Sequence, residues 1–257
     1  LALVLGVAGV AEHDVGLAAD DVVVEAGGDE GVDGVRAGKD APGDGGVGVL
    51  ALGDLDGFDG LDVAAVGTGA GMVKHGLSLT DADAAIRGKA LEFILSLVDF
   101  GGQLGAPAIL GSMQGRSNAT VSHDVALRYL AEALHVISAR AATHGVKFIY
   151  EPLNRYETNL FNRIGDAAAF LEKHQLTNVT LLADLFHMNI EEVSLEQAIA
   201  ENFSSIGHIH FADSNRRAMG FGHTESKALL LLLHQLGYDG YLSAEILPLP
   251  SADEAAA

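Results

Sequence analysis

Four polar residues, each at the end of a short apolar segment typical of a β-strand, are the residues best placed to do chemistry: Glu151, Asp184, His210 and Glu245. When such strands run parallel in an α/β barrel, their carboxyl ends meet at one face, where active sites are built. Carboxylates and an imidazole meeting there suit one hard divalent ion, Mn²⁺ or Mg²⁺. We predict these four residues as its ligands, although each alone is equally explained as a hydrogen-bonded residue at a strand end.

Glu151 and Glu245 fit a second role, because they end strands that are well separated around the expected barrel. Two carboxylates on opposite sides of a sugar carbon can invert that carbon, since one removes its proton and the other returns a proton on the far side. A metal at the neighbouring carbonyl and hydroxyl oxygens would stabilise the enediolate between the two steps. The pair therefore predicts catalysis of stereochemical inversion.

Other polar residues lie just past these strand ends. Arg216 could clamp oxygens of a substrate, and the alternative is a surface arginine paired with Asp213. His187 could donate to a substrate oxygen or simply pack in its loop. Glu157 could bind a terminal hydroxyl or orient His187, or it could be a solvated charge. His208 shares a strand face with the predicted ligand two residues later and is expected to pack inside the barrel.

The elements that would position these residues alternate between strands of about five residues and helices of about ten, which indicates βα units and a parallel sheet. Strands are expected at 107–111, 147–151, 179–184, 206–210 and 241–245. Helices are expected at 80–98 with Thr80 as cap, 124–143 with Ser122 as cap and Gly145 as stop, 166–174, 195–200 and 226–236. The predicted fold is a (β/α)8 TIM barrel that is incomplete or irregular over its first three βα units, residues 1–75.

Residues 1–75 differ from the rest in composition. They hold 18 of the 32 glycines and a single aromatic residue, Phe58. Natural domains use a wider set of residue types. Glycine runs through the whole stretch and no capped amphipathic helix is evident. Strand-like pieces occur at 21–25, 47–52 and 61–66.

Three interpretations of this stretch are open: a degenerate start of the barrel, a flexible segment, or the product of reading GC-rich DNA in the wrong frame or strand. We favour the third. The expected organisation is an atypical segment rich in Gly, Ala, Val and Asp at 1–76, followed by the barrel region at 77–257. A closed eight-stranded barrel would need three strands from the atypical segment.

Composition narrows the range of partners. The net charge of −20 argues against nucleic acid and against anionic membrane, because both need a basic surface. No apolar run reaches the roughly 18 residues of a transmembrane helix. The absence of cysteine excludes disulfides and thiolate chemistry and fits a reducing compartment, so we expect a cytoplasmic protein.

Several segments together resemble the sugar phosphate isomerase/epimerase superfamily, the xylose isomerase-like TIM barrels, and within it the ketose 3-epimerases of the D-tagatose and D-psicose type. They are Gly111-Ser-Met-Gln-Gly-Arg116, Glu151-Pro-Leu-Asn-Arg-Tyr-Glu-Thr-Asn159, Asp184-Leu-Phe-His-Met-Asn189, His208-Ile-His-Phe-Ala-Asp-Ser-Asn-Arg216, Gly222-His-Thr224 and Gly240-Tyr-Leu-Ser-Ala-Glu245. The resemblance covers residues from about 77 to 254, and residues 1–75 match none of the family's first strands.

The resemblance implies the same four metal ligands, Glu151 and Glu245 as the proton-exchanging pair, and Glu157, His187 and Arg216 as substrate contacts. It also implies a small-molecule sugar substrate and a homo-oligomer. Three alternatives are weighed against a ketose epimerase. An aldose–ketose isomerase would use the same site, and an inactive barrel fragment or binding module would keep the site without the activity. A nuclease of the endonuclease IV type would need more histidines and a basic surface, which the charge of −20 opposes.

Overall fold

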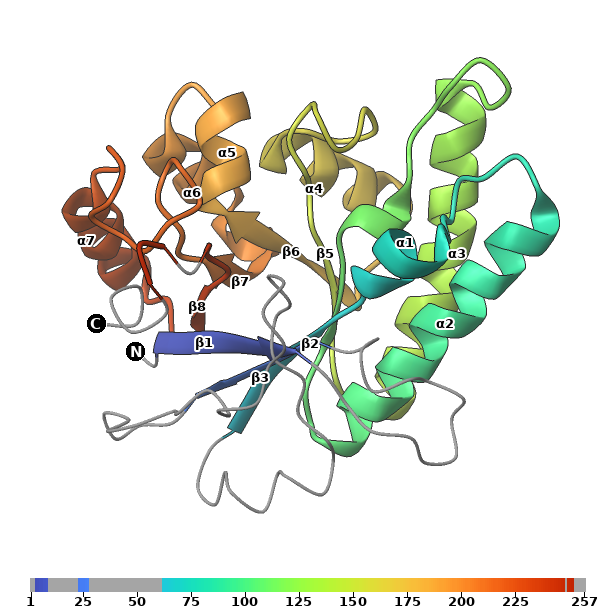
Figure 1. The fold of residues 1–257 in the computed structure, drawn as a ribbon, viewed down its shortest axis with the longest axis horizontal. Helices are drawn as coiled ribbons and strands as arrows, with labels where there is room; N and C mark the ends of the chain where they lie inside the picture. The colour runs from blue at the N-terminus through green and yellow to red at the C-terminus, as the bar shows by residue number, and fades with distance from the viewer. Residues whose placement is uncertain (1–2, 9–22, 28–61, 248, 252–257) are drawn as a thin grey trace.

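The computed structural model describes residues 3–8, 23–27, 62–247 and 249–251. Within these residues eight strands close a barrel in sequence order, and helices pack around its outside (Figure 1). The predicted barrel is therefore confirmed, as is its irregularity at the amino-terminal end. Among the described residues, no helix is long and apolar enough to span a membrane.

The five strands expected in the orderly part are all present. They are β4 (Ala108–Leu110), β5 (Phe148–Tyr150), β6 (Val179–Asp184), β7 (Ile206–His210) and β8 (Leu242–Ala244). Each pairs in parallel with the next. Their carboxyl ends therefore share one face of the barrel.

The remaining strands are β1 (Leu3–Ala8), β2 (Val23–Gly27) and β3 (Asp62–Gly67). β1 is parallel to β8 and β3 is parallel to β4, but β2 runs antiparallel to both of its neighbours. The strand-like pieces at 21–25 and 61–66 thus correspond to β2 and β3, while the piece at 47–52 lies outside the described residues.

Helices connect the parallel strands. The longer ones are α2 (Ala84–Gln103), α3 (His123–Thr143), α4 (Ile164–Lys173) and α7 (Ser226–Leu236), and the shorter ones are α1 (Ala70–His75), α5 (Leu185–Glu191) and α6 (Leu195–Asn202). Two single 3-10 turns, η3 (Ser112–Gln114) and η4 (Phe203–Ser205), precede α3 and β7.

The predicted start of α2 was wrong by one turn. Asp83, not Thr80, is the N-cap, and its side chain accepts a hydrogen bond from the backbone N–H of Ala85 at 2.8 Å. Thr80 is buried and donates its hydroxyl to the carbonyl of Gln114 at 3.1 Å. Ser122 does precede α3 as predicted, but its side chain makes no capping hydrogen bond.

The apolar core has two layers. A large cluster lies between the sheet and the helices, and it includes Phe148 and Tyr150 of β5. A smaller cluster fills the barrel interior and consists of Ala65, Ile109, Ile149 and Leu182. Neighbouring residues of β5 therefore face opposite sides of the sheet, as strand geometry requires.

Candidate metal and active site

Strand alternation determines which side chains meet at the carboxyl end of the barrel. On each of four strands, an inward-facing residue precedes a polar residue by two places, so both point inward. The pairs are Ile149 on β5 with Glu151 just after it, Leu182 and Asp184 on β6, His208 and His210 on β7, and Ser243 on β8 with Glu245 just after it. One ligand atom from each of the four outer residues lies within 4.8 Å of the others. The structure thus brings together the four residues predicted as metal ligands.

His210 stands among the three carboxylates. Its Nδ1 lies 3.2 Å from Glu245 Oε2, 3.3 Å from Asp184 Oδ2 and 3.9 Å from Glu151 Oε1. Glu151, Asp184 and His210 are buried, whereas the side chain of Glu245 is 47% exposed. The cluster is therefore reached from solvent on the Glu245 side.

The surroundings of Glu151 fit a cation. Its Oε1 is buried and has no hydrogen-bond partner among the described residues. Burial, and then the charge of Glu245, raise the pKa of Glu151 well above its usual range. Burial also acts to raise the pKa of Asp184, but hydrogen bonding to His210 and nearby positive charge lower it to about 2. A divalent cation would satisfy the orphaned oxygen and offset the repulsion between the carboxylates.

A buried hydrogen-bond network holds the backbone at Glu151. Gln114 donates its Nε2 protons to the carbonyls of Gly111 and Glu151, at 3.0 and 2.9 Å. Tyr150 donates its hydroxyl to Gln114 Oε1 at 2.6 Å. A Cβ on Gly111 would lie 2.6 Å from Glu151 Oε2, so a larger residue there would displace the carboxylate from this position. Gln114 was not predicted as a site residue, although it lies in one of the motif segments.

Arg216 reaches the cluster from the loop after β7. Its Nη2 lies 2.7 Å from Glu245 Oε2, and its guanidinium lies 5.0 Å from the ring of Phe186. The expected alternative, an ion pair with Asp213, is wrong for a local reason. Arg216 takes a left-handed backbone conformation, with φ of 57°, and Asp213 is occupied by backbone donors.

Asp213 organises this loop from a buried position. Its carboxylate accepts hydrogen bonds from the backbone N–H groups of Ser214, Gly220, Gly222 and Thr224, at 2.7 to 3.0 Å. Burial acts to raise the pKa of Asp213, but these donors hold it far below its usual range. The loop that carries Arg216 is thus folded around one ionised carboxylate.

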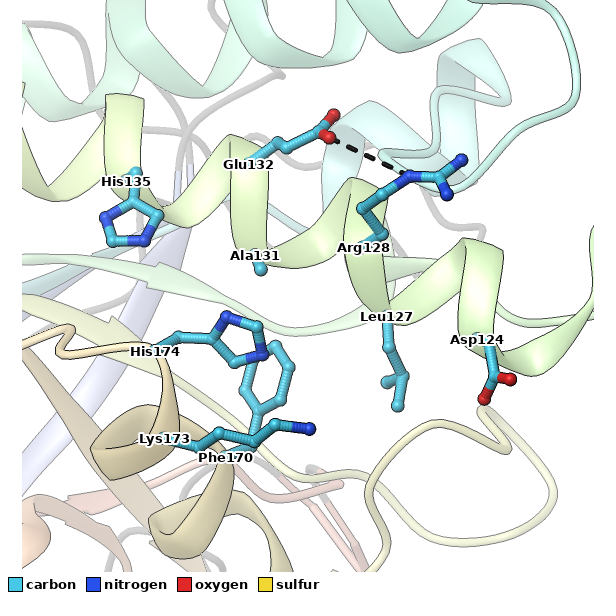
Figure 2. Close-up of a pocket in the computed structure, with 9 residues that line it drawn as sticks. All are labelled: Asp124, Leu127, Arg128, Ala131, Glu132, His135, Phe170, Lys173 and His174. Atoms are coloured by element: carbon cyan, nitrogen blue, oxygen red, sulfur yellow. Dashed lines mark ion pairs between the residues drawn. The ribbon is translucent and has the colours of Figure 1, made fainter.

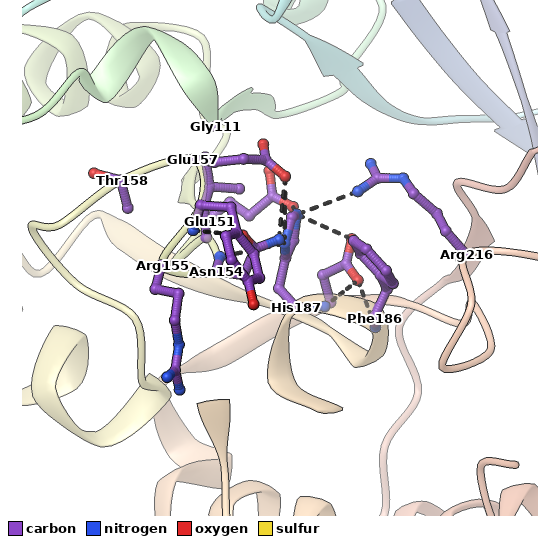
Figure 3. Close-up of polar contacts among 12 residues, drawn as sticks. Gly111, Glu151, Asn154, Arg155, Glu157, Thr158, Phe186, His187 and Arg216 are labelled. Carbon is purple, nitrogen blue, oxygen red and sulfur yellow. Dashed lines mark hydrogen bonds and ion pairs between the residues drawn. The ribbon is translucent and has the colours of Figure 1, made fainter. Parts of the chain in front are cut away.

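His187 and Glu157 also lie at the cluster. Figure 3 shows His187 between the loop that carries Glu151 and Glu157 and the side chain of Arg216. Its Nε2 is 3.7 Å from Glu151 Oε1, and its Nδ1 is 3.8 Å from Glu157 Oε1. His208 lies deeper in the barrel, where its Nε2 is 2.8 Å from Ser243 Oγ, in the packed position expected for it.

A separate pocket of about 390 Å³ lies on the outer surface, between α3 and α4 (Figure 2). Acidic, basic and apolar side chains line it, and none of the four clustered residues is among them. Its residues are Asp124, Leu127, Arg128, Ala131, Glu132, His135, Phe170, Lys173 and His174. This pocket is therefore separate from the four-residue cluster at the barrel mouth.

The chain is similar to a known family of barrel proteins and to two sugar epimerases. The sequence model of a family described as "Xylose isomerase-like TIM barrel" matches residues 54–257. The chain is 34% identical over 162 residues to the 3-dehydro-D-guloside 4-epimerase of Escherichia coli, an alignment that covers 61% of this chain and 62% of that protein. It is 32% identical over 180 residues to the L-ribulose 3-epimerase of Mesorhizobium japonicum, covering 68% of this chain and 60% of the relative.

A solved structure of a sugar epimerase is also similar to this chain. The apo crystal structure of 3-keto-D-glucoside 4-epimerase from E. coli matches with a TM-score of 0.63 and 27% sequence identity, over 70% of this chain and 72% of that one. The chain spans about three fifths of the length of the two curated relatives above, 62% and 60%.

Proposed function

The chain belongs to the xylose isomerase-like TIM barrel family, and on that premise we propose that it is a divalent-metal-dependent sugar epimerase. The observation that carries the proposal is the convergence of Glu151, Asp184, His210 and Glu245 at one end of the barrel. The names of the relatives support the reaction class, since both proteins are epimerases of sugars that bear a carbonyl.

Glu151, Asp184, His210 and Glu245 would hold one Mn²⁺ or Mg²⁺ ion, which when bound stabilises negative charge that develops on the sugar oxygens. Glu151 and Glu245 would exchange a carbon-bound proton, one removing it and the other returning a proton on the opposite side. Glu157, His187 and Arg216 would contact the hydroxyl and carbonyl oxygens of the substrate. We propose a ketose or keto-sugar in which the inverted carbon lies next to the carbonyl.

Exchange of a carbon-bound sugar proton with deuterated water tests this reaction directly. With added Mn²⁺, the protein should incorporate deuterium into L-ribulose or a similar ketose, as followed by mass spectrometry. Glu245→Gln should lower the exchange rate by about 10²–10⁴-fold, the usual contribution of a general acid or base. Full exchange by a folded Glu245→Gln variant would refute the role of this carboxylate.

An aldose–ketose isomerase would differ in its product. Such an enzyme would yield an aldose from the same ketose, whereas an epimerase yields a second ketose, and chromatography of the sugars separates the two. The alternative of an inactive barrel fragment would keep the clustered residues without the activity, and the chain spans 62% and 60% of the length of the two curated relatives. Binding of Mn²⁺ without deuterium exchange on any ketose would support that alternative.

A further inference from the structure

Asn154, in the loop after β5, contacts a residue of the proposed site. Its side-chain Nδ2 lies 2.7 Å from His187 Nδ1, and its backbone N–H donates to the same nitrogen at 3.3 Å. Asn154 and His187 are both 2% exposed, so water does not compete for these contacts. One imidazole nitrogen therefore faces two nitrogen atoms of the same asparagine.

The orientation of the Asn154 amide is fixed by its other partners. Its Oδ1 accepts a hydrogen bond from the backbone N–H of Tyr156 at 2.9 Å, and its Nδ2 donates to Glu157 Oε1 at 3.2 Å. Exchanging the amide oxygen and nitrogen would place N–H against N–H at Tyr156 and oxygen against carboxylate at Glu157. The network thus requires the NH₂ group to face His187.

Two donors directed at Nδ1 leave that nitrogen as an acceptor, so the proton of the neutral ring lies on Nε2. The competing arrangement has Nδ1–H donating to Glu157 Oε1 and Arg216 Nη1 donating to Nε2. The distances oppose it, because 3.8 Å to Glu157 is too long for a hydrogen bond and 3.4 Å to Arg216 is at the limit. The 2.7 Å contact with Asn154 decides between the two.

We propose that Asn154 is a positioning residue that fixes His187 as the Nε2–H tautomer, so that His187 donates a hydrogen bond to the substrate. This inference rests on the proposed epimerase function of the same site. His187 Nε2 and Arg216 Nη1 are then two donors 3.4 Å apart that cannot satisfy each other. Both are placed to bind one common acceptor, a sugar oxygen that gains negative charge during proton exchange.

The tautomer can be observed without any turnover. In protein labelled with [¹⁵N]histidine and loaded with diamagnetic Mg²⁺, long-range ¹H–¹⁵N correlation spectra distinguish the protonated from the unprotonated ring nitrogen. We expect His187, assigned by its loss in His187→Gln, to show protonated Nε2 and unprotonated Nδ1. Protonated Nδ1 with unprotonated Nε2 in the wild-type protein would overturn the proposal.

Substitution of Asn154 can separate its proposed effect on the His187 tautomer from a general effect on folding. Asn154→Asp places an acceptor at Nδ1, so the proton should move to Nδ1 and kcat should fall about 100-fold, the usual loss for one donor to a developing oxyanion. KM should change little, because the lost interaction forms mainly in the transition state. The matched control is Asn159→Ala in the same loop. Among the described residues its amide hydrogen-bonds the backbone of Ser117, so this variant should leave tautomer and kcat unchanged.

The outcomes distinguish this inference from the proposed function. A wild-type protein with the Nε2–H tautomer and no deuterium exchange on any ketose would refute the epimerase but keep the role of Asn154 in fixing the ring. An active enzyme whose Asn154→Asp variant folds and keeps both the Nε2–H tautomer and wild-type kcat would refute the positioning role alone.

Discussion

Strands β4–β8 and strands β1–β3 close the same barrel, but they do so by different pairings. Every neighbouring pair from β3 to β8 is parallel, and β8 is also parallel to β1. The two pairs that involve β2 are antiparallel. Barrel closure therefore tolerates a reversed strand in the amino-terminal part of the chain.

The proposed site does not tolerate such a reversal, because it depends on strand ends that share a face. Its four clustered residues lie on or just after β5–β8, whose carboxyl ends point the same way. The carboxyl end of β2 points to the opposite face, because β2 is antiparallel to both of its neighbours. Parallel strands β5–β8 therefore position the four clustered residues, whereas β1–β3 contribute to closure of the barrel.

Substitutions in the core should have the largest effects on the free energy of unfolding, and the loss should be larger on β5 than on β3. Ile149→Ala on β5 removes a side chain that is 1% exposed inside the barrel and should lower the free energy of unfolding by about 2–5 kcal/mol. Val66→Ala on β3 removes less apolar surface and should cost about 1–2 kcal/mol. Urea denaturation measures both values. A larger loss for Val66→Ala would show that β3 is as tightly coupled to the core as β5.

The parts of the fold that the sequence predicted are those with local signals. Strands β4–β8 alternate with helices that begin after a polar residue, such as Ser122 before α3 and Ser194 before α6, so their direction follows from the βα rule. The reversal of β2 has no such signal, because strand direction depends on long-range pairing. The start of α2 was misplaced because Thr80 and Asp83 are both good caps, and the choice depends on burial of Thr80 against Gln114.

The residues of the candidate site divide in the same way, into those with a local sequence signal and those without one. Its four clustered residues were predicted because each is an acid or a histidine at a strand end, and strand alternation turns that position into a direction. Asn154, Gln114 and Asp213 were not predicted as site residues, because they act through hydrogen bonds to backbone groups or to other side chains. Backbone groups are the same at every residue, so sequence alone does not reveal which of them a side chain will meet.

Metal addition should stabilise the site-bearing region through its ligands. At a Mn²⁺ concentration 100 times the dissociation constant, mass action should add about 2.7 kcal/mol to the free energy of unfolding. Asp184→Asn weakens the ligand set and should reduce this increment, as measured by thermal melts across a Mn²⁺ titration. An equal Mn²⁺ shift in the wild type and in Asp184→Asn would mean that the ion binds elsewhere.

The loop anchored by Asp213 should make stability depend on acid pH. The folded-state pKa of Asp213 is depressed, so its contribution is complete above the unfolded pKa of about 3.9 and is lost as pH falls below that value. Asp213→Asn has a single acceptor oxygen for four N–H donors and should cost about 1–3 kcal/mol at pH 7. Unfolding curves at pH 7 and pH 3 test this, since the difference between wild type and variant should shrink at the lower pH. A difference that is the same at both values would contradict the ionised anchor.

The smallest effect is expected on the outer surface, far from the barrel mouth. Glu132 pairs with Arg128 one helical turn away on α3, at 3.8 Å, and both side chains are more than half exposed, 67% and 61%. Exposed pairs of this kind contribute about 0.3–0.5 kcal/mol on a helix and are screened by salt. Glu132→Gln should therefore change the free energy of unfolding by no more than this and leave deuterium exchange at the wild-type rate. If Glu132→Gln reduced deuterium exchange, the pocket between α3 and α4 would have to be coupled to the proposed site, and the reaction would depend on the outer helices as well as on the strand ends.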